Sequence, residues 1–161
     1  MSMGDVVLRD ADRPGDLGWV VMAHGELYAR EYGWSVEAVT ARIVADFAAG
    51  PAHDRAWIAE LDRRRVGCVF CVHEDASTAR LRLLLLDPVA RGLGVGRALV
   101  RRCVAHARDA EYGRLVLWTN APLDAARTIY LAEGFRLVAE AEHDEFGVAL
   151  LGQDYELVLT A

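Results

Sequence analysis

The apolar positions of this chain follow two periods, one typical of helices and the other typical of strands. Apolar residues that recur every three or four positions give a helix one hydrophobic face, whereas short alternating or unbroken apolar runs suit strands. The helical period occupies residues 17–32, 36–49, 95–110 and 124–133. Strand patterns occupy residues 6–9, 55–60, 65–73, 79–86, 115–118, 135–142 and 154–159.

The order of these stretches predicts the fold class. They follow one another as β-α-α-β-β-β-α-β-α-β-β, which favours an α/β (α+β) fold with a mixed central sheet and helices on both faces. The 161 residues contain no low-complexity linker and no internal repeat. A chain of this length can bury a real core but is short for two ordinary domains, so residues 1–161 are expected to form a single domain.

Composition and charge limit the expected partners. The formal net charge is -6, which does not suit a general nucleic-acid surface, so no direct nucleic-acid binding is expected and any anion site must be local. Near the N-terminus only Val6, Val7 and Leu8 are apolar before Arg9, a pattern that predicts neither a signal peptide nor a membrane span. We therefore expect a cytoplasmic protein that does not bind membranes.

The cysteines and the acidic residues predict neither a redox pair nor a metal site. Cys68 and Cys71 lie in a predicted strand, where residues three apart face opposite sides, and Cys103 lies on the apolar face of a predicted helix. His143, Asp144 and Glu145 form a run whose spacing does not bring three ligands together. We expect no metal.

The candidate chemistry is concentrated after an apolar run that stops at Pro88. The chain there passes through Gly92, Gly94 and Gly96 into a predicted helix. A strand, a glycine-rich turn and a helix start bring backbone N–H groups together at the positive end of the helix dipole. Phosphate groups bind such a loop without special side chains.

Two phosphate-binding patterns do not fit this loop. A nucleotide-triphosphate loop needs a lysine after its glycines, and all 18 basic residues of this chain are arginine. A dinucleotide fingerprint needs the spacing Gly-x-Gly-x-x-Gly near the first strand. The glycines here are spaced Gly-x-Gly-x-Gly and follow the fourth predicted strand.

A third pattern fits in full, and it carries a resemblance to a known family. The hexad Arg91-Gly92-Leu93-Gly94-Val95-Gly96 follows a strand that ends before Pro88, and Ala126, Tyr130, Gly134 and Phe135 form a second signature. With these motifs and this order of elements, the sequence resembles the GNAT superfamily of acetyl-CoA-dependent acetyltransferases. The resemblance implies a GNAT-like, mostly antiparallel sheet. The family usually has Asn where this chain has Leu123, and Asn120 is the candidate substitute.

A finer resemblance concerns three further segments, residues 81–88, 117–120 and 152–157. They are similar to the acetyltransferase half of bacterial proteins that fuse a MarR-type winged helix to a GNAT domain. No winged helix is expected within residues 1–161, because the first strand starts at Val6.

The family resemblance implies a function and a set of site residues. It implies transfer of an acetyl group from acetyl-CoA to an amine by direct attack in a ternary complex; the alternative is a non-catalytic acetyl-CoA-binding sensor or regulatory module. Tyr130 would protonate the departing thiolate as general acid, the Leu86 N–H would stabilise the oxyanion, and the fourth strand would splay from the fifth to admit pantetheine. The implied cofactor-binding residues are Leu84, Leu86, Arg91, Gly92, Leu93, Gly94, Val95, Gly96, Arg97, Asn120, Ala126 and Tyr130.

The acceptor side is less defined. Many family members carry a basic carboxylate early on the fourth strand, where this chain has Arg80 and Arg82. The first helix instead places His24, Tyr28, Glu31 and Tyr32 on one face. With Trp34, these residues form either a structural stripe or the wall of an acceptor pocket.

Within that wall, Glu31 is the first candidate for a base or for contact with a cationic acceptor, and His24 is the second. Residues 147–152 are candidates for a loop over the acceptor. The acceptor amine can belong to a small molecule or to a peptide. The chain can also form a homodimer.

Overall fold

The structure is a computed structural model that describes residues 5–160. Its α-helices are α1 (Asp16–Tyr32), α2 (Glu37–Ala48), α3 (Val95–Asp109) and α4 (Asp124–Ala132), with a short 3-10 helix η2 (Pro88–Ala90). Its strands are β1 (Val6–Asp10), β2 (Arg55–Leu61), β3 (Arg64–Asp75), β4 (Thr78–Leu86), β5 (Arg114–Asn120), β6 (Arg136–His143) and β7 (Leu150–Val158). The predicted order of elements is confirmed.

The strands form one seven-stranded sheet in the order β1-β2-β3-β4-β5-β7-β6. Neighbouring strands are antiparallel except β4 and β5, which are parallel because α3 connects them across the sheet. The sheet is therefore mixed and mostly antiparallel, as predicted.

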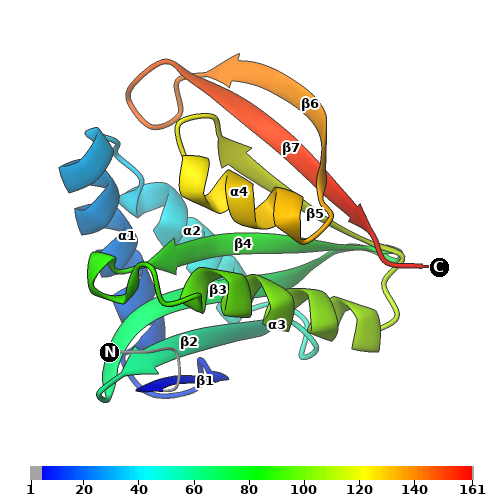
Figure 1. Ribbon diagram of the computed structural model, residues 1–161, viewed down its shortest axis with the longest axis horizontal. Helices are drawn as coiled ribbons and strands as arrows, with labels where there is room; N and C mark the ends of the chain where they lie inside the picture. The colour runs from blue at the N-terminus through cyan, green and yellow to red at the C-terminus, as the bar shows by residue number, and fades with distance from the viewer. Residues whose placement is uncertain (1–4, 161) are drawn as a thin grey trace.

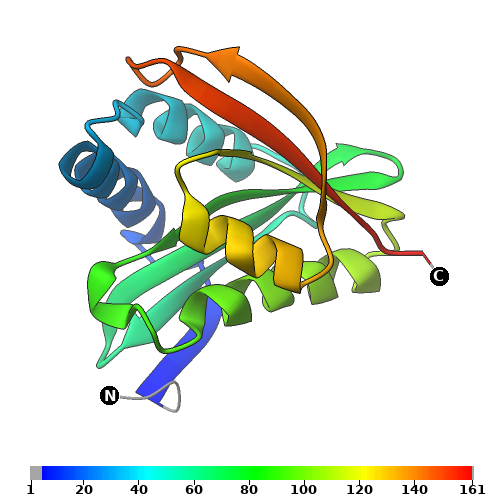
Figure 2. The ribbon, with the colours of Figure 1, turned by 45° about the horizontal axis from the view of Figure 1, so that its top comes forward.

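Helices cover both faces of the sheet. In Figures 1 and 2, α3 and α4 lie on one face, and α1 and α2 lie on the other. Each face has its own hydrophobic core: Leu99 and Cys103 of α3 pack with Cys71, whereas Val20 of α1 packs with Cys68. The two cysteines of β3 thus face opposite sides as predicted, and all three cysteines of the chain are buried free thiols.

Strands β4 and β5 are paired over only part of their length. Their register joins Thr78, Ala79 and Arg80 to Arg114, Leu115 and Val116. Beyond these pairs the two strands diverge, and the opening between them is plain in Figure 1. The rest of β5 keeps its pairing with β7 on its other edge. The predicted splay of the fourth strand from the fifth is therefore present.

A β-bulge interrupts β4 where the strands diverge. Between the pairs Phe70–Arg82 and Cys68–Leu85, two residues of β4, Leu83 and Leu84, lie opposite one residue of β3, Val69. Leu83 lies within the bulge and has a φ of 56°, a left-handed conformation that is rare for a residue with a Cβ. The bulge turns the end of β4 relative to its beginning.

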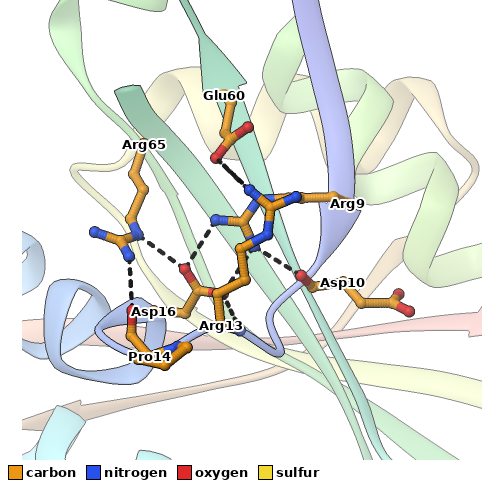
Figure 3. A network of polar contacts seen from close by, with 7 residues as sticks. All are labelled: Arg9, Asp10, Arg13, Pro14, Asp16, Glu60 and Arg65. Carbon is orange, nitrogen blue, oxygen red and sulfur yellow. Dashed lines mark hydrogen bonds and ion pairs between the residues drawn. The ribbon is translucent and has the colours of Figure 1, made fainter. Parts of the chain in front are cut away.

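A buried carboxylate fixes the start of α1 (Figure 3). Asp16 is fully buried, and its oxygens accept hydrogen bonds from the guanidinium groups of Arg9 and Arg65 and from the Arg13 amide. Burial alone would raise the pKa of Asp16, but these hydrogen bonds outweigh burial and hold the pKa well below its usual range. The network joins α1 to β1 and β3, and so positions one wall of the cavity described below.

The last strand differs from the prediction. Strand β7 begins at Leu150, not at residue 154, because residues 150–153 pair with β6, and Gly152 and Gln153 also pair with β5. The loop between β6 and β7 is therefore residues 144–149, earlier than the expected 147–152. Within residues 5–160, no helix is long and apolar enough to cross a membrane.

Candidate active site

A cavity of about 590 Å³ opens where β4 and β5 diverge. Its lining comes from both helices of one face, from β4 and β5, from the glycine loop and from α4. The predicted cofactor-binding and acceptor residues that line it are His24, Tyr28, Glu31, Tyr32, Trp34, Leu84, Leu86, Arg91, Gly92, Gly94, Val95, Gly96, Arg97, Asn120, Ala126 and Tyr130. Leu93 is the exception, because it packs against the core under α3.

The glycine loop presents unused backbone donors to this cavity. Gly92 and Gly94 have φ angles of 78° and 79°, and Gly94 is the N-cap of α3. The first hydrogen bond of the helix runs from Ala98 N–H to Gly94 O. Among the described residues, nothing accepts a hydrogen bond from the amides of residues 95–97, so these donors fit an anionic pyrophosphate.

Open space surrounds the two left-handed glycines. A Cβ built on Gly92 or Gly94 would meet no atom within 4 Å. Gly96 is different, because its Cβ would lie 2.9 Å from Cδ1 of Ile129 on α4. The first two glycines therefore permit the turn and leave room above it, whereas Gly96 permits close packing of α3 on α4.

The arginines of the loop already hold carboxylates. Arg91 donates to both oxygens of Glu31, at 2.5 and 2.9 Å. Arg97 donates to Glu133 at 2.8 Å. Both arginine side chains are about half exposed. A phosphate group would therefore have to compete with these acids for the predicted arginine contacts.

The end of β4 offers an open edge of backbone donors and acceptors. The Asp87 N–H donates to Val66 O at 2.7 Å, so the preceding N–H, that of Leu86, points away from β3. On that side β5 has already diverged. Leu84 lies two residues earlier, on the same edge as Leu86. The two leucines thus expose backbone polar groups to the cavity.

Tyr130 of α4 lines the cavity from the face of the sheet that α3 and α4 cover, opposite the face covered by α1 and α2 (Figure 1). Its side chain is buried and packs near Phe135 and Tyr155, with ring centroids 5.7 and 6.2 Å away. Burial, with a smaller contribution from Tyr28, raises the pKa of Tyr130. Within the described part of the chain the hydroxyl has no hydrogen-bond partner, so a protonated phenol is left to face a ligand.

Asn120, the last residue of β5, is buried at the cavity. Its Oδ1 lies 2.6 Å from Nε2 of His143, which leaves its amide N–H groups for other partners. Leu123, at the position where the family usually has Asn, packs instead against the cluster of Trp34 and Phe146. A role of Asn120 in cofactor binding stays a prediction.

The predicted acceptor wall is present, and it is also a packed aromatic cluster. Tyr28 and Tyr32 stack on Trp34, with ring centroids 5.8 and 4.6 Å away. His24 lies beside Tyr28 at 5.7 Å. The same side chains line the cavity. The structural interpretation of this stripe is therefore confirmed, and its role as the wall of an acceptor pocket stays a prediction.

The two candidate bases are both constrained. The Nδ1 of His24 lies 2.8 Å from Val20 O, an acceptor, so Nδ1 carries the proton and Nε2 keeps a lone pair. Burial lowers the pKa of His24 to about 4, despite the opposing effect of this hydrogen bond. The imidazole is therefore neutral at pH 7. Glu31 can serve an acceptor only when Arg91 moves away.

Phe146 completes the wall, and sequence reasoning missed it. Its ring centroid lies 5.9 Å from that of Trp34, and its backbone oxygen accepts the Ser35 N–H at 3.0 Å. The loop after α1 and the loop after β6 thus meet across the cavity. No local pattern indicated Phe146, because the two loops are far apart in the sequence.

Acidic and histidine side chains do not gather into a metal site. Within residues 5–160, no group of three or more His, Cys, Asp or Glu could hold a metal ion. His143 instead contacts Asn120, Trp118 and Phe146.

Comparison with known protein sequences gives a family match. Residues 21–135 match the model of the acetyltransferase (GNAT) family. N-acetylaspartate synthetase of Danio rerio is 39% identical over 87 residues, which are 53% of this chain and 31% of that protein. The chain thus spans about a third of the length of this curated relative.

Solved structures share the fold. An acetyltransferase from Streptococcus agalactiae has a TM-score of 0.79 at 20% identity, covering 96% of this chain and 99% of its own. The yncA protein of Salmonella typhimurium, solved with its cofactor acetyl-CoA, has a TM-score of 0.73 at 19% identity, covering 97% and 95%. The GNAT-like fold predicted from the sequence is confirmed.

Proposed function

The chain belongs to the acetyltransferase (GNAT) family, and we propose that it transfers an acetyl group from acetyl-CoA to an amine by direct attack in a ternary complex. One observation supports this most strongly. The unused amides of residues 95–97, the open edge of Leu86 and the hydroxyl of Tyr130 lie on a single cavity. The amides can bind a pyrophosphate, the Leu86 N–H can stabilise an oxyanion, and the Tyr130 hydroxyl can protonate a thiolate.

Donor binding is assigned to the loop and to the end of β4. The amides that follow Gly94 would hold the pyrophosphate, with Arg91 and Arg97 exchanging their carboxylate partners for phosphate. The backbone of Leu84 and Leu86 would pair with the pantetheine amides. The cavity of about 590 Å³ falls within the 300–1,000 Å³ range of small-molecule sites.

The residues divide the chemical step between them. The amine nitrogen attacks the thioester carbonyl carbon, and the Leu86 N–H stabilises the oxyanion that forms. When the carbon–sulfur bond breaks, the electron pair goes to sulfur and the Tyr130 hydroxyl supplies the proton. Burial raises the pKa of Tyr130, so its phenol is protonated at neutral pH and carries the proton that this step needs. The products are the acetylated amine and the CoA thiol.

The proton that the attacking amine loses needs an acceptor. An alkylamine with a pKa of about 10.4 costs roughly 4 to 5 kcal/mol to keep neutral at pH 7. Glu31 and His24 remain the proposed bases, with Glu31 acting only after acetyl-CoA has drawn Arg91 away. Glu31→Gln and His24→Gln variants test this, because loss of a base lowers kcat/KM at neutral pH more than at high pH.

The acceptor is proposed as a primary amine of a small molecule or a peptide. The name N-acetylaspartate synthetase of the relative adds amino acids to this set. The alternative of a non-catalytic acetyl-CoA sensor would share the donor site but would not require Tyr130. The resemblance to MarR-fused acetyltransferases, a homodimer and a cytoplasmic location stay predictions from the sequence.

The decisive experiment has two parts. Calorimetry first measures acetyl-CoA binding, and release of the CoA thiol is then followed with an alkylamine, an amino acid and a peptide N-terminus as acceptors. Thiol release that depends on an added amine supports the proposal. Binding of acetyl-CoA without thiol release from any amine would support the sensor instead.

A further inference from the structure

Arg82 lines the cavity but has no role in the proposed reaction. It lies on β4 opposite Phe70, whose side chain packs in the core beneath α1 and α2. Opposite residues share a face of the sheet, so Arg82 points toward these helices. It lines the cavity together with Val39, Thr40 and Ile43 of α2. None of these residues belongs to the glycine loop.

Arg82 also differs from the other arginines of the cavity in having no partner. Arg80 is paired with Glu74, Arg91 with Glu31 and Arg97 with Glu133. Among residues 5–160, none forms an ion pair or a side-chain hydrogen bond with the Arg82 guanidinium. A guanidinium group carries five donors, and leaving them unused in a partly buried place is unfavourable.

The charges and the burial around Arg82 also leave its positive charge unbalanced. Burial lowers the pKa of Arg82, and the like charge of Arg80 adds to that effect. Two carboxylates act in the opposite direction, those of Glu74 and Asp46, but neither comes within ion-pair distance. Glu74 is already held by Arg80. A guanidinium group stays charged under these conditions, so a further anion would stabilise it.

We propose that Arg82 binds a carboxylate of the acceptor, so that the acceptor is an amino acid or another amine with a carboxylate. The inference rests on the proposed acetyl transfer and names the substrate class of the same site. Arg82 precedes Leu86 by four residues on β4, and the bulge at Leu83 lies between them. An acceptor whose amine lies at Leu86 and whose carboxylate points along β4 therefore approaches the guanidinium. The carboxylate is either an α-carboxylate or one in the side chain.

The charges on the cavity wall agree with an anionic acceptor. Its acidic residues are Glu31, which Arg91 holds, and Glu145 in the loop after β6. Its basic side chains include four arginines, in a protein whose net charge is -6. The cavity is thus more positive than the chain as a whole. This reverses the cationic acceptor that the sequence suggested through Glu31.

The first test compares acceptors in the thiol-release assay. L-Aspartate, L-asparagine and L-alanine carry a carboxylate, and L-alaninamide does not. The wild-type protein is expected to prefer its carboxylate-bearing acceptor over alaninamide by about 100-fold in kcat/KM. Activity with asparagine and alanine identifies the α-carboxylate, and activity with aspartate alone identifies the side-chain carboxylate. Arg82→Gln should abolish the preference mainly by raising KM, and Arg82→Lys should restore part of it.

The second test does not depend on turnover. Succinate, a dicarboxylate without an amine, is titrated calorimetrically into the protein saturated with CoA. Wild-type protein and an Arg102→Gln control should bind it, because Arg102 is exposed on α3 and does not line the cavity. Arg82→Gln should bind it at least 10-fold more weakly.

The outcomes separate this inference from the proposed function. If the wild-type protein used alaninamide as well as it uses aspartate, asparagine and alanine, or if Arg82→Gln left the acceptor preference unchanged, the role of Arg82 would be overturned and acetyl transfer would be left standing. Absence of thiol release with every amine would overturn acetyl transfer. The succinate titration would then decide alone: weaker binding by Arg82→Gln would support the carboxylate site, and equal binding would overturn it.

Discussion

Substituting Gly94 with alanine tests whether the glycine loop binds the pyrophosphate, as proposed, or only makes a structural turn. Gly94 has a φ of 79°, and a Cβ there meets nothing within 4 Å. Gly33, the C-cap of α1, has a φ of 73° and equally open surroundings, but it does not line the cavity. Gly33→Ala is therefore a matched control for backbone strain.

The cost in stability follows from the backbone alone. A left-handed residue with a Cβ costs roughly 1 to 2 kcal/mol, and no steric clash adds to it at either position. For a domain of this size, about 1 kcal/mol lowers Tm by roughly 2 to 4 °C. Gly94→Ala and Gly33→Ala should therefore show similar losses in thermal stability.

The cost in affinity should differ between the two variants. The Cβ of Gly94→Ala would occupy the open space next to the amides of residues 95–97, where the pyrophosphate is proposed to bind. Each hydrogen bond to a charged group contributes about 1.5 to 3 kcal/mol, and 1.4 kcal/mol is tenfold in affinity. Losing one such bond weakens acetyl-CoA binding by about 10-fold to 100-fold.

Calorimetry with acetyl-CoA and thermal unfolding together give the answer. The expected result is weak acetyl-CoA binding in Gly94→Ala and wild-type binding in Gly33→Ala, at similar Tm. If Gly94→Ala bound acetyl-CoA as tightly as Gly33→Ala, the loop would be a structural turn and the assignment of the pyrophosphate site would be refuted.

Two further variants test the ion pairs of the fold. Glu31→Gln removes the carboxylate that competes for Arg91, so calorimetry should show acetyl-CoA binding a few-fold more tightly; unchanged affinity would mean that Arg91 does not contact phosphate. Asp16→Asn leaves Arg9 and Arg65 without their buried partner, so denaturant titration should show a loss of about 3 to 5 kcal/mol. Because the folded-state pKa of Asp16 lies below the unfolded value of about 3.9, its stabilisation is complete above roughly pH 4 and falls as pH drops through the folded pKa. The acid-induced loss should be smaller in Asp16→Asn, and an equal loss would contradict the role of this network.

Local signals in the sequence predicted most of the fold. The glycine hexad and the apolar run before Pro88 specified a strand, a turn and a helix, because each depends on residues close in the chain. Strand β7 begins earlier than predicted, because residues 150–153 are held by pairing with β6, and from Gly152 onward also with β5, rather than by a local pattern. Tertiary pairing decides such boundaries.

The cavity was predictable in its donor half and less so elsewhere. Motif residues such as Gly94 and Tyr130 were named because their spacing is fixed by one turn or one helix. Contacts between distant segments were missed, including Arg91 with Glu31 and Phe146 with Trp34. The unpaired state of Arg82 is likewise a property of its neighbours in space, so no sequence pattern could indicate it.

The most direct test of the account is the kcat of Tyr130→Phe in the thiol-release assay, with saturating acetyl-CoA and the best amine. Tyr112→Phe is the control, because Tyr112 lies outside the cavity and its hydroxyl is 3.0 Å from His73 Nδ1. If Tyr130 protonates the leaving thiolate, kcat falls about 10² to 10⁴-fold in Tyr130→Phe, with near wild-type acetyl-CoA affinity, and is little changed in the control. A Tyr130→Phe variant that kept the wild-type kcat would contradict the account.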